Sequence, residues 1–366
     1  MTTRRLIIAS AALSALDTAD AHGAVVIPAP RNGIDRDLAP WNGPAPTRPT
    51  PSVETKTGWC PVVSLNGTVT GQNGQACFWF SNGASIGCPV PDGTSRGPIP
   101  NSKDPAKWRR KMNTCGANVT AAVCDPKQRT VNTGAACGAD DDWYYSSPWR
   151  APGSSGVFDP CGMAGGHKPP DGGFGGIYVN TTHAKLGDRG TDVLPRGPPT
   201  ATWTQGAEVE VSWAIEANHG GGYQYRLCPA ENATTEACFQ RMPLPFVGQQ
   251  GLRWYGRDSP DAIAISFKGV YVTEGVSPPG AAWAMNPIPR NDEGQTGKGF
   301  APRCTNASMC QGMEDGSNAN PNMEIVDKLQ VPLWVPAGDY VLGWRWDCEE
   351  SNQIWQSCSD ITIVAP

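Results

Sequence analysis

Residues 208–216 read Glu-Val-Glu-Val-Ser-Trp-Ala-Ile-Glu, and this stretch decides the fold class. Apolar and polar side chains alternate along it with a period of two, which is typical of a strand with one buried face and one solvated face. The apolar positions are Val209, Val211, Trp213 and Ile215. We therefore expect a β-strand here, with these four side chains in a hydrophobic core.

Further strand-like segments lie on both sides of this one, at residues 23–27, 223–227, 262–272, 340–346 and 360–364. Only 17% of the 366 residues are charged, while 43 are Gly, 35 are Pro and 14 are Trp. This composition favours short strands joined by long loops over helices. The sequence therefore predicts an all-β protein, built as an antiparallel β-sandwich.

The first 21 residues have the composition of a secretory signal peptide. Arg4 and Arg5 precede an apolar run at residues 6–16, and Ala19-Asp20-Ala21 matches a cleavage signal. Cleavage after residue 21 leaves a single domain, residues 22–366, with His22 at its N-terminus. The protein is therefore expected to be secreted into the extracellular space.

Cysteine content and glycosylation motifs agree with secretion. The 13 cysteines predict up to six disulfides and one remaining thiol, with seven of the cysteines in a loop-rich region at residues 59–170. The chain also contains five N-x-S/T motifs, which mark candidate glycosylation sites. They lie at Asn66, Asn118, Asn180, Asn232 and Asn306.

Charge and hydropathy exclude two classes of partner. The formal net charge is −5 and there is no basic run to neutralise phosphates, so we expect no nucleic acid partner. After the signal peptide, no apolar stretch approaches the roughly 20 residues of a membrane-spanning helix. No membrane association is expected once the signal peptide is removed.

His22 and His219 are the candidate metal ligands. An N-terminal histidine offers a metal two nitrogens, the α-amino group and ring Nδ1, which close a chelate. His219 follows the strand at residues 208–216 and precedes Gly220-Gly221-Gly222, which permits a tight turn with His219 exposed at the strand end. The resulting T-shaped set of three nitrogens suits one copper ion, whereas zinc prefers a tetrahedral set with a carboxylate or thiolate.

Several motifs around these histidines resemble those of the lytic polysaccharide monooxygenases. They are His22-Gly23-Ala24 with Pro28 and Arg31-Asn32, residues 218–228 (Asn-His-Gly-Gly-Gly-Tyr-Gln-Tyr-Arg-Leu-Cys), Trp344-Arg345-Trp346-Asp347-Cys348, and residues 355–361. Within that group the chain is most similar to the chitin-binding type 4 proteins of eukaryotes. The similarity extends over most of residues 22–364.

This resemblance implies an immunoglobulin-like β-sandwich with long disulfide-stapled loops and a copper histidine brace, formed by His22 and His219, on a flat face. It also implies oxidative cleavage of glycosidic bonds in a crystalline β-linked polysaccharide, either chitin or cellulose, at C1 or C4 of a sugar. The partners would be the insoluble polysaccharide and an external electron donor. Two alternatives on the same scaffold are a non-catalytic carbohydrate-binding protein and an extracellular copper-binding protein.

The resemblance also suggests groups beside the copper. The aromatic residue that the family places axial to the metal, usually Tyr or Phe, falls on Trp355 when counted back from Asp360-Ile361. Tryptophan has no ligand oxygen, so it would act as a wall that shields this side. Gln353 would share a face with Trp355 and position the oxygen species by hydrogen bonding, with Glu349 and Glu350 as competitors for that role.

A flat polysaccharide surface is gripped by exposed aromatic and amide groups. The candidates for this substrate-binding role are Trp41, Tyr223, Tyr225 and Asn32. Strand parity leaves open which of the tyrosines faces outward.

The remaining polar candidates are expected to be ordinary surface residues. Arg345 and Asp347 alternate with tryptophans and are interpreted as solvated positions on a strand. His167 and His183 lie in loop sequence without an adjacent ligand.

Overall fold

The computed structural model describes residues 22–39, 41, 74–84, 86–87, 91, 147–166, 178–233, 235–254, 257, 263–288, 323–349 and 351–366. Some predicted features lie outside these residues. They are the signal peptide, His167, Glu350, and the glycosylation motifs at Asn66, Asn118 and Asn306.

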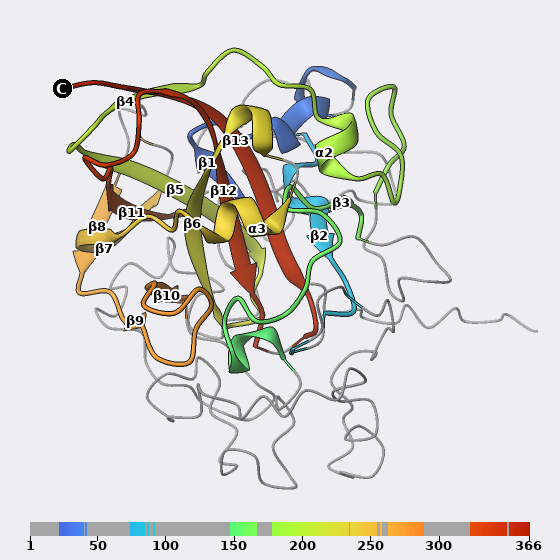
Figure 1. Ribbon diagram of the computed structural model, residues 1–366. Helices are drawn as coiled ribbons and strands as arrows, with labels where there is room; N and C mark the ends of the chain where they lie inside the picture. The colour runs from blue at the N-terminus through green and yellow to red at the C-terminus, as the bar shows by residue number, and fades with distance from the viewer. Residues whose placement is uncertain are drawn as a thin grey trace, which may run out of the picture.

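Two β-sheets form the body of the molecule (Figure 1). The five-stranded sheet has the order β1 (His22–Ile27), β5 (Glu208–Ala217), β11 (Met323–Gln330), β7 (Phe246–Trp254) and β8 (Ile263–Phe267). The second sheet has the order β3 (Met163–Ala164), β2 (Trp79–Ser81), β13 (Ile354–Val364), β12 (Gly338–Asp347), β6 (Gly222–Pro229), β10 (Trp283–Met285) and β9 (Tyr271–Val272). Strand β4 (Ala201–Thr204) pairs with β13 in parallel, whereas the pairs within these two orders are antiparallel. The predicted all-β sandwich is confirmed.

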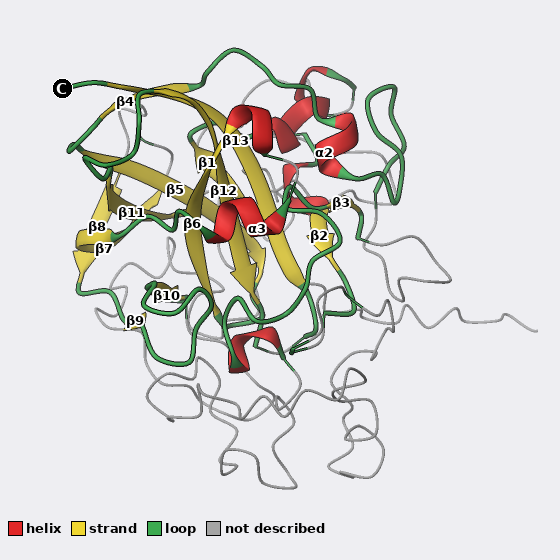
Figure 2. Ribbon diagram, viewed as in Figure 1, coloured by secondary structure: helices red, strands yellow, loops and turns green. Residues whose placement is uncertain are grey.

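Helical segments are short and lie outside the sheets (Figure 2). They are η1 (Arg31–Asp37), η2 (Ala76–Phe78), η5 (Pro148–Arg150), α2 (Gly190–Val193), η6 (Ala230–Asn232) and α3 (Glu236–Gln240). In the described part of the chain, no helix combines the length and apolar character needed to cross a membrane.

The strand predictions agree best where the sequence alternates most clearly, although the expected solvated face of β5 is not exposed along its length: Ser212 is completely buried and Ala214 is 1% exposed. Strand β5 ends one residue beyond the predicted segment 208–216. The segment predicted at 360–364 instead belongs to β13, which begins at Ile354 and is buried at each of its first eight residues. Alternation is missing there because both faces of the strand are covered. The segment predicted at 262–272 contains two separate strands, β8 and β9.

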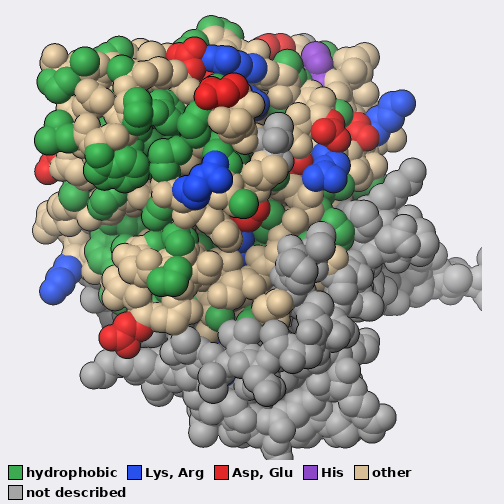
Figure 3. Space-filling model, in the orientation of Figure 1, with side chains coloured by type: hydrophobic (Ala, Val, Ile, Leu, Met, Phe, Trp, Pro, Cys, Tyr) green, Lys and Arg blue, Asp and Glu red, His purple; other side chains and the backbone are tan. Residues whose placement is uncertain are grey.

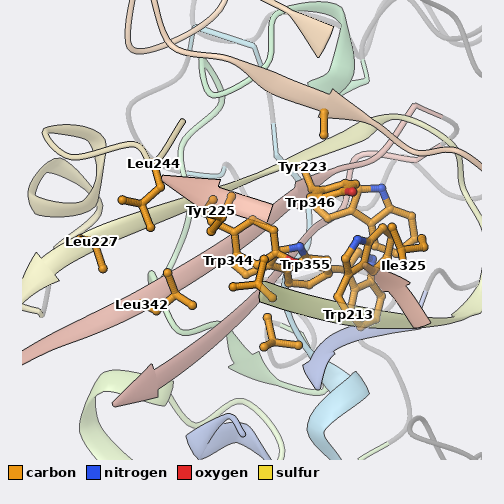
Figure 4. Close-up of a cluster of buried hydrophobic side chains, with 14 of the residues drawn as sticks. Trp213, Tyr223, Tyr225, Leu227, Leu244, Ile325, Leu342, Trp344, Trp346 and Trp355 are labelled. Carbon is orange, nitrogen blue, oxygen red and sulfur yellow. The ribbon is translucent and has the colours of Figure 1, made fainter. Parts of the chain in front are cut away.

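Tryptophan and tyrosine rings fill the space between the sheets (Figure 4). The Trp213 ring of β5 lies 5.0 Å from that of Trp344 and 5.2 Å from that of Trp346, measured between ring centroids. Trp344 and Trp346 both belong to β12 in the opposite sheet, so these contacts join the two layers. Large buried aromatic side chains dominate core energetics.

A carboxyl group lies inside this aromatic core. Tyr223 Oη donates a hydrogen bond to Asp327 Oδ2 at 2.7 Å, and Gln250 Nε2 donates one to Asp327 Oδ1 at 3.1 Å. Burial raises the pKa of Asp327 to about 7, although these two hydrogen bonds oppose that effect. The Asp327 carboxyl group therefore holds its proton more tightly in the folded protein than in the unfolded chain.

Asp327 should make stability depend on pH. The pKa of Asp327 rises from an ordinary value of 3.8 to about 7 on folding. As the pH increases from the first value to the second, the free energy of unfolding should therefore fall by roughly 4 kcal/mol. The Asp327→Asn variant cannot titrate here, so we expect it to gain stability relative to the wild type between pH 5 and pH 8. Urea unfolding at both pH values measures this difference.

The exposed Asp37, with 89% of its side chain accessible, supplies the control. Asp37→Asn should follow the pH dependence of the wild type. The same pH dependence in Asp327→Asn and the wild type would contradict the assignment.

Disulfides attach the loops and α3 to the second sheet. Cys161, in the predicted loop region, is bonded to Cys358 of β13, and Cys228 of β6 is bonded to Cys238 of α3. Cys77 is also disulfide-bonded. Cys348, directly after β12, is buried.

Candidate metal centre

Pairing of β1 with β5 brings the two predicted ligands to one end of the five-stranded sheet. The strands are antiparallel, and His22 lies opposite Ala217, the last residue of β5. His219 follows only two residues later. The start of β1 and the loop after β5 are therefore neighbours, although the two histidines are far apart in the sequence.

The glycines after His219 allow this loop to approach the end of β12. Gly220 and Gly221 have positive φ angles of 62° and 78°, the left-handed conformation that glycine adopts without strain. A Cβ atom on Gly221 would lie 2.1 Å from the carbonyl oxygen of Asp347. The backbone N–H of Glu349 donates to the His219 carbonyl at 3.0 Å, which joins the loop to the connection between β12 and β13.

The side chain of Asn218 also holds this loop in place, through three hydrogen bonds. Its Oδ1 accepts hydrogen bonds from the Gly220 backbone N–H and from Asn286 Nδ2, both at 2.9 Å. Its Nδ2 donates to the Ile288 carbonyl at 3.0 Å, and Trp346 Nε1 donates to the Gly220 carbonyl at 2.7 Å. The backbone beside His219 is therefore fixed by hydrogen bonds from several elements.

The ring of His219 is buried, with 5% of the residue exposed. The prediction that it is exposed at the strand end was wrong, because the connection between β12 and β13 packs against it. From this connection, Ser351 places its Oγ 3.0 Å from His219 Nδ1. The same Oγ donates to Gln353 Oε1 at 3.1 Å.

Two aromatic rings lie against His22. The Phe78 ring meets it edge-on at a centroid distance of 4.8 Å, and the Trp355 ring lies at 5.2 Å with an interplanar angle of 48°. Trp355 is fully buried and stacks on Phe80 at 4.2 Å. The residue predicted to shield the metal therefore lies beside one of the two candidate ligands.

Sequence reasoning did not identify Phe78 or Ser351. Phe78 ends the short η2 segment, where no periodic pattern marks its position. The available signal was the aromatic sequence Phe78-Trp79-Phe80 directly after Cys77. Ser351 has no sequence signal that separates it from an ordinary loop serine.

Gln353 and Glu349 differ in how they contact the loop. Both are buried, at 4% and 1% exposure. Gln353 is connected to the His219 ring through the Ser351 hydroxyl, whereas Glu349 contacts His219 through its backbone N–H. The Gln353 side chain is therefore linked to the His219 ring by hydrogen bonds through Ser351.

The predicted aromatic groups of the substrate surface lie in the interior. Trp41 is 1% exposed, and Tyr223 and Tyr225 are completely buried. Both tyrosines belong to β6, whose first seven residues are all buried, so neither face of this part of the strand is solvated. Their prediction as exposed sugar-stacking groups was wrong.

Asn32 has a structural role instead of the predicted contact with sugar. It is fully buried, its Nδ2 donates to the Cys161 carbonyl, and its Oδ1 accepts from the Cys358 N–H, both at 2.8 Å. These hydrogen bonds bridge the backbones of two disulfide-bonded cysteines.

Arg345 and Asp347 are also buried, so their interpretation as solvated positions was wrong. Neither side chain is exposed, and Arg345 Nε donates to Asp347 Oδ1 at 2.6 Å. Arg345 Nη1 also donates to Glu236 Oε1 at 2.8 Å. Ion pairing makes their burial possible. His183, by contrast, is exposed as predicted.

Two of the most exposed apolar side chains, Leu333 and Trp334, lie at the other end of the sandwich. On the face drawn in Figure 3, apolar groups gather on the left, while charged groups of both signs are scattered. Leu333 and Trp334 are 71% and 64% exposed and precede β12. Because the ten residues of β12 span roughly 33 Å, this pair is remote from His219, which lies beside the far end of the strand.

Sequence comparisons connect the chain to one class of protein. No family model matches it. A protein from Pyricularia oryzae described as "AA13 family lytic polysaccharide monooxygenase A" is 25% identical over 193 residues, covering 46% of this chain and 43% of the relative. The chain thus spans less than half the length of this curated relative.

Two distant matches among solved structures are also monooxygenases of this class. An AA15 lytic polysaccharide monooxygenase from Thermobia domestica is 16% identical, with 47% of this chain and 66% of that chain covered and a TM-score of 0.25. An AA10 lytic polysaccharide monooxygenase from Streptomyces lividans is 9% identical, with coverages of 55% and 66% and a TM-score of 0.22. TM-scores this low carry no argument. By its motifs and its curated relative, the chain is similar to the lytic polysaccharide monooxygenases.

Proposed function

We propose that the protein is a secreted copper-dependent monooxygenase that oxidatively cleaves glycosidic bonds of a crystalline β-linked polysaccharide, chitin or cellulose. The observation that carries this proposal is the β1–β5 register, in which His22 lies opposite a residue only two positions before His219. The similarity to the curated monooxygenase supports the same class of reaction.

The donor chemistry of this region fits copper. Among the described residues, no group of three or more His, Cys, Asp or Glu side chains is placed to hold a metal. Beside the two histidine rings, the α-amino group of His22 would supply a third nitrogen donor after cleavage of the signal peptide. Such nitrogen ligation suits copper, which would supply one-electron redox chemistry toward an oxygen co-substrate.

The residues around His22 would orient the ligand and exclude water. Phe78 and Trp355 pack against its imidazole, and the indole offers a donor N–H but no ligand oxygen. Trp355 is held in place by its stacking on Phe80. These contacts fix the ring while leaving ligation to nitrogen atoms.

A second candidate function, an extracellular copper-binding protein, is favoured by one observation. All four residues predicted to grip a polysaccharide surface are buried. Such a protein would retain the two histidines and their aromatic support without acting on a glycan.

Product analysis separates the two functions. Mature protein beginning at His22, loaded with copper and supplied with ascorbate, should release C1- or C4-oxidised oligosaccharides from chitin or cellulose, detected by mass spectrometry. An insoluble α-linked glucan tests the predicted linkage, and metal-free protein is the control. Copper binding without oxidised product on any glycan would exclude the monooxygenase and leave the copper-binding function.

A further inference from the structure

The hydrogen bonds around Ser351 define the protonation pattern of the His219 ring. The Ser351 hydroxyl carries one proton, which it donates to Gln353 Oε1 at 3.1 Å. Its contact with His219 Nδ1, at 3.0 Å, must then be one in which Nδ1–H donates to Oγ. A neutral imidazole has one N–H, so the lone pair of this tautomer lies on Nε2.

We propose that Ser351 and Gln353 are positioning residues that hold His219 in the Nδ1–H tautomer, with Nε2 presented as the ligand atom. A metal binds the nitrogen that carries the lone pair, and the hydrogen bond at the other nitrogen determines which one this is. The role in copper binding rests on the proposed function. The tautomer itself is a property of the metal-free protein.

The backbone makes this arrangement rigid before any metal binds. The connection between β12 and β13 carries both positioning residues, and its Glu349 N–H donates to the carbonyl of His219 itself. The connection is closed by a hydrogen bond from the Cys348 N–H to the Gln353 carbonyl at 3.2 Å. The same short segment therefore holds His219 at both its backbone and its ring.

This arrangement gives Gln353 a role beside the one that the family resemblance implies. Its Oε1 accepts a hydrogen bond from Ser351, so this end of the amide acts on the His219 ring through the serine hydroxyl.

Nitrogen NMR of the metal-free protein tests the tautomer directly. Protein labelled with ¹⁵N-histidine is examined at about pH 8, above the ordinary imidazole pKa of about 6.5. His219→Ala identifies the signals of His219. We expect the Nδ1–H tautomer in the wild type and a shift toward Nε2–H, which solvated imidazole prefers, in Ser351→Ala. An Nε2–H tautomer in the wild type, or an unchanged tautomer in Ser351→Ala, would overturn the proposal.

Copper affinity tests the consequence. Ser351→Ala should weaken Cu(II) binding by about 10- to 100-fold, the usual effect of losing a hydrogen-bond partner of a ligand, and Ser351→Thr, which keeps the hydroxyl, should restore most of it. Ser266→Ala, at an exposed position of β8, is the matched control and should bind like the wild type.

The two experiments separate failure of this inference from failure of the proposed function. Tight copper binding that Ser351→Ala does not change would overturn the positioning role while leaving the copper site intact. The expected tautomer in a protein that binds no copper would instead overturn the proposed function, because the histidine would be oriented without a metal to receive.

Discussion

Replacing His219 by alanine is expected to weaken Cu(II) binding by more than about 100-fold, because a direct ligand should contribute more than the 10- to 100-fold associated with its hydrogen-bond partners. The structure supports a local effect, since the surrounding loop is held by backbone contacts and by Asn218 rather than by the His219 ring alone. Isothermal titration calorimetry with a competing chelator measures the affinity. The Cu(II) electron paramagnetic resonance spectrum reports the change in nitrogen ligation.

His183→Ala is the matched control, because His183 is exposed and its backbone N–H is held by Thr181 independently of its ring. It should bind copper like the wild type. Equal losses in the two variants would show that copper binds histidines non-specifically, and no loss in His219→Ala would remove His219 from the ligand set.

The same measurement of Cu(II) affinity tests whether the N-terminal amine is a ligand. One extra glycine before His22 moves the α-amino group away from the imidazole and breaks the chelate, while the sequence of the folded domain stays the same. We expect a loss of affinity similar to that of His219→Ala. Wild-type affinity in the extended protein would exclude the amine as a donor.

The second large effect concerns stability and involves Glu236, which pairs with two buried arginines. Its Oε1 accepts hydrogen bonds from Arg226 Nη1 and Arg345 Nη1, and these arginine side chains are only 1% and 0% exposed. Burial alone would raise the pKa of Glu236, but the two guanidinium groups hold it below the ordinary value. The carboxylate is therefore charged in the folded protein and partly balances two buried cations.

Glu236→Ala is expected to destabilise the fold by about 3–5 kcal/mol, since removing one partner of a buried ion pair leaves uncompensated charge. Glu236→Gln should lose less, because the amide oxygen still accepts a hydrogen bond. Urea unfolding near neutral pH, where the carboxylate is ionised, measures both losses.

Asp339→Ala is the control for a surface ion pair. Asp339 pairs with Arg196, and their side chains are 47% and 50% exposed, so its loss should cost less than about 1 kcal/mol. A Glu236→Ala protein within 1 kcal/mol of the wild type would show that the two arginines find other compensation.

Much of the fold could be predicted where the sequence alternates. Strand β5 was predicted to within one residue because one of its faces is polar and the other apolar. Strand β13 was predicted only at its C-terminal end, since its earlier residues are buried on both faces and show no alternation. Periodicity reports burial only when the two faces of a strand differ.

Two residues of the candidate site could be predicted from the sequence, and two could not. His22 and His219 were identifiable because few residue types bind metals, and because the expected signal-peptide cleavage and the glycines after His219 give their positions a chemical meaning. Phe78 and Ser351 were not, because each becomes relevant only through a ring contact or hydrogen bond to a residue distant in sequence.

The all-β class, the glycine-specific backbone at Gly220-Gly221 and the two histidines as candidate ligands could be predicted from local sequence. These follow from local properties, namely side-chain alternation, backbone freedom and donor chemistry. By contrast, the interior position of Tyr223 and Tyr225 and the contact of the β12–β13 connection with His219 depend on how the strands pack together. The burial of a residue and its hydrogen-bond partners depend on which strands pack over it. The residues next to it in the sequence do not specify those strands.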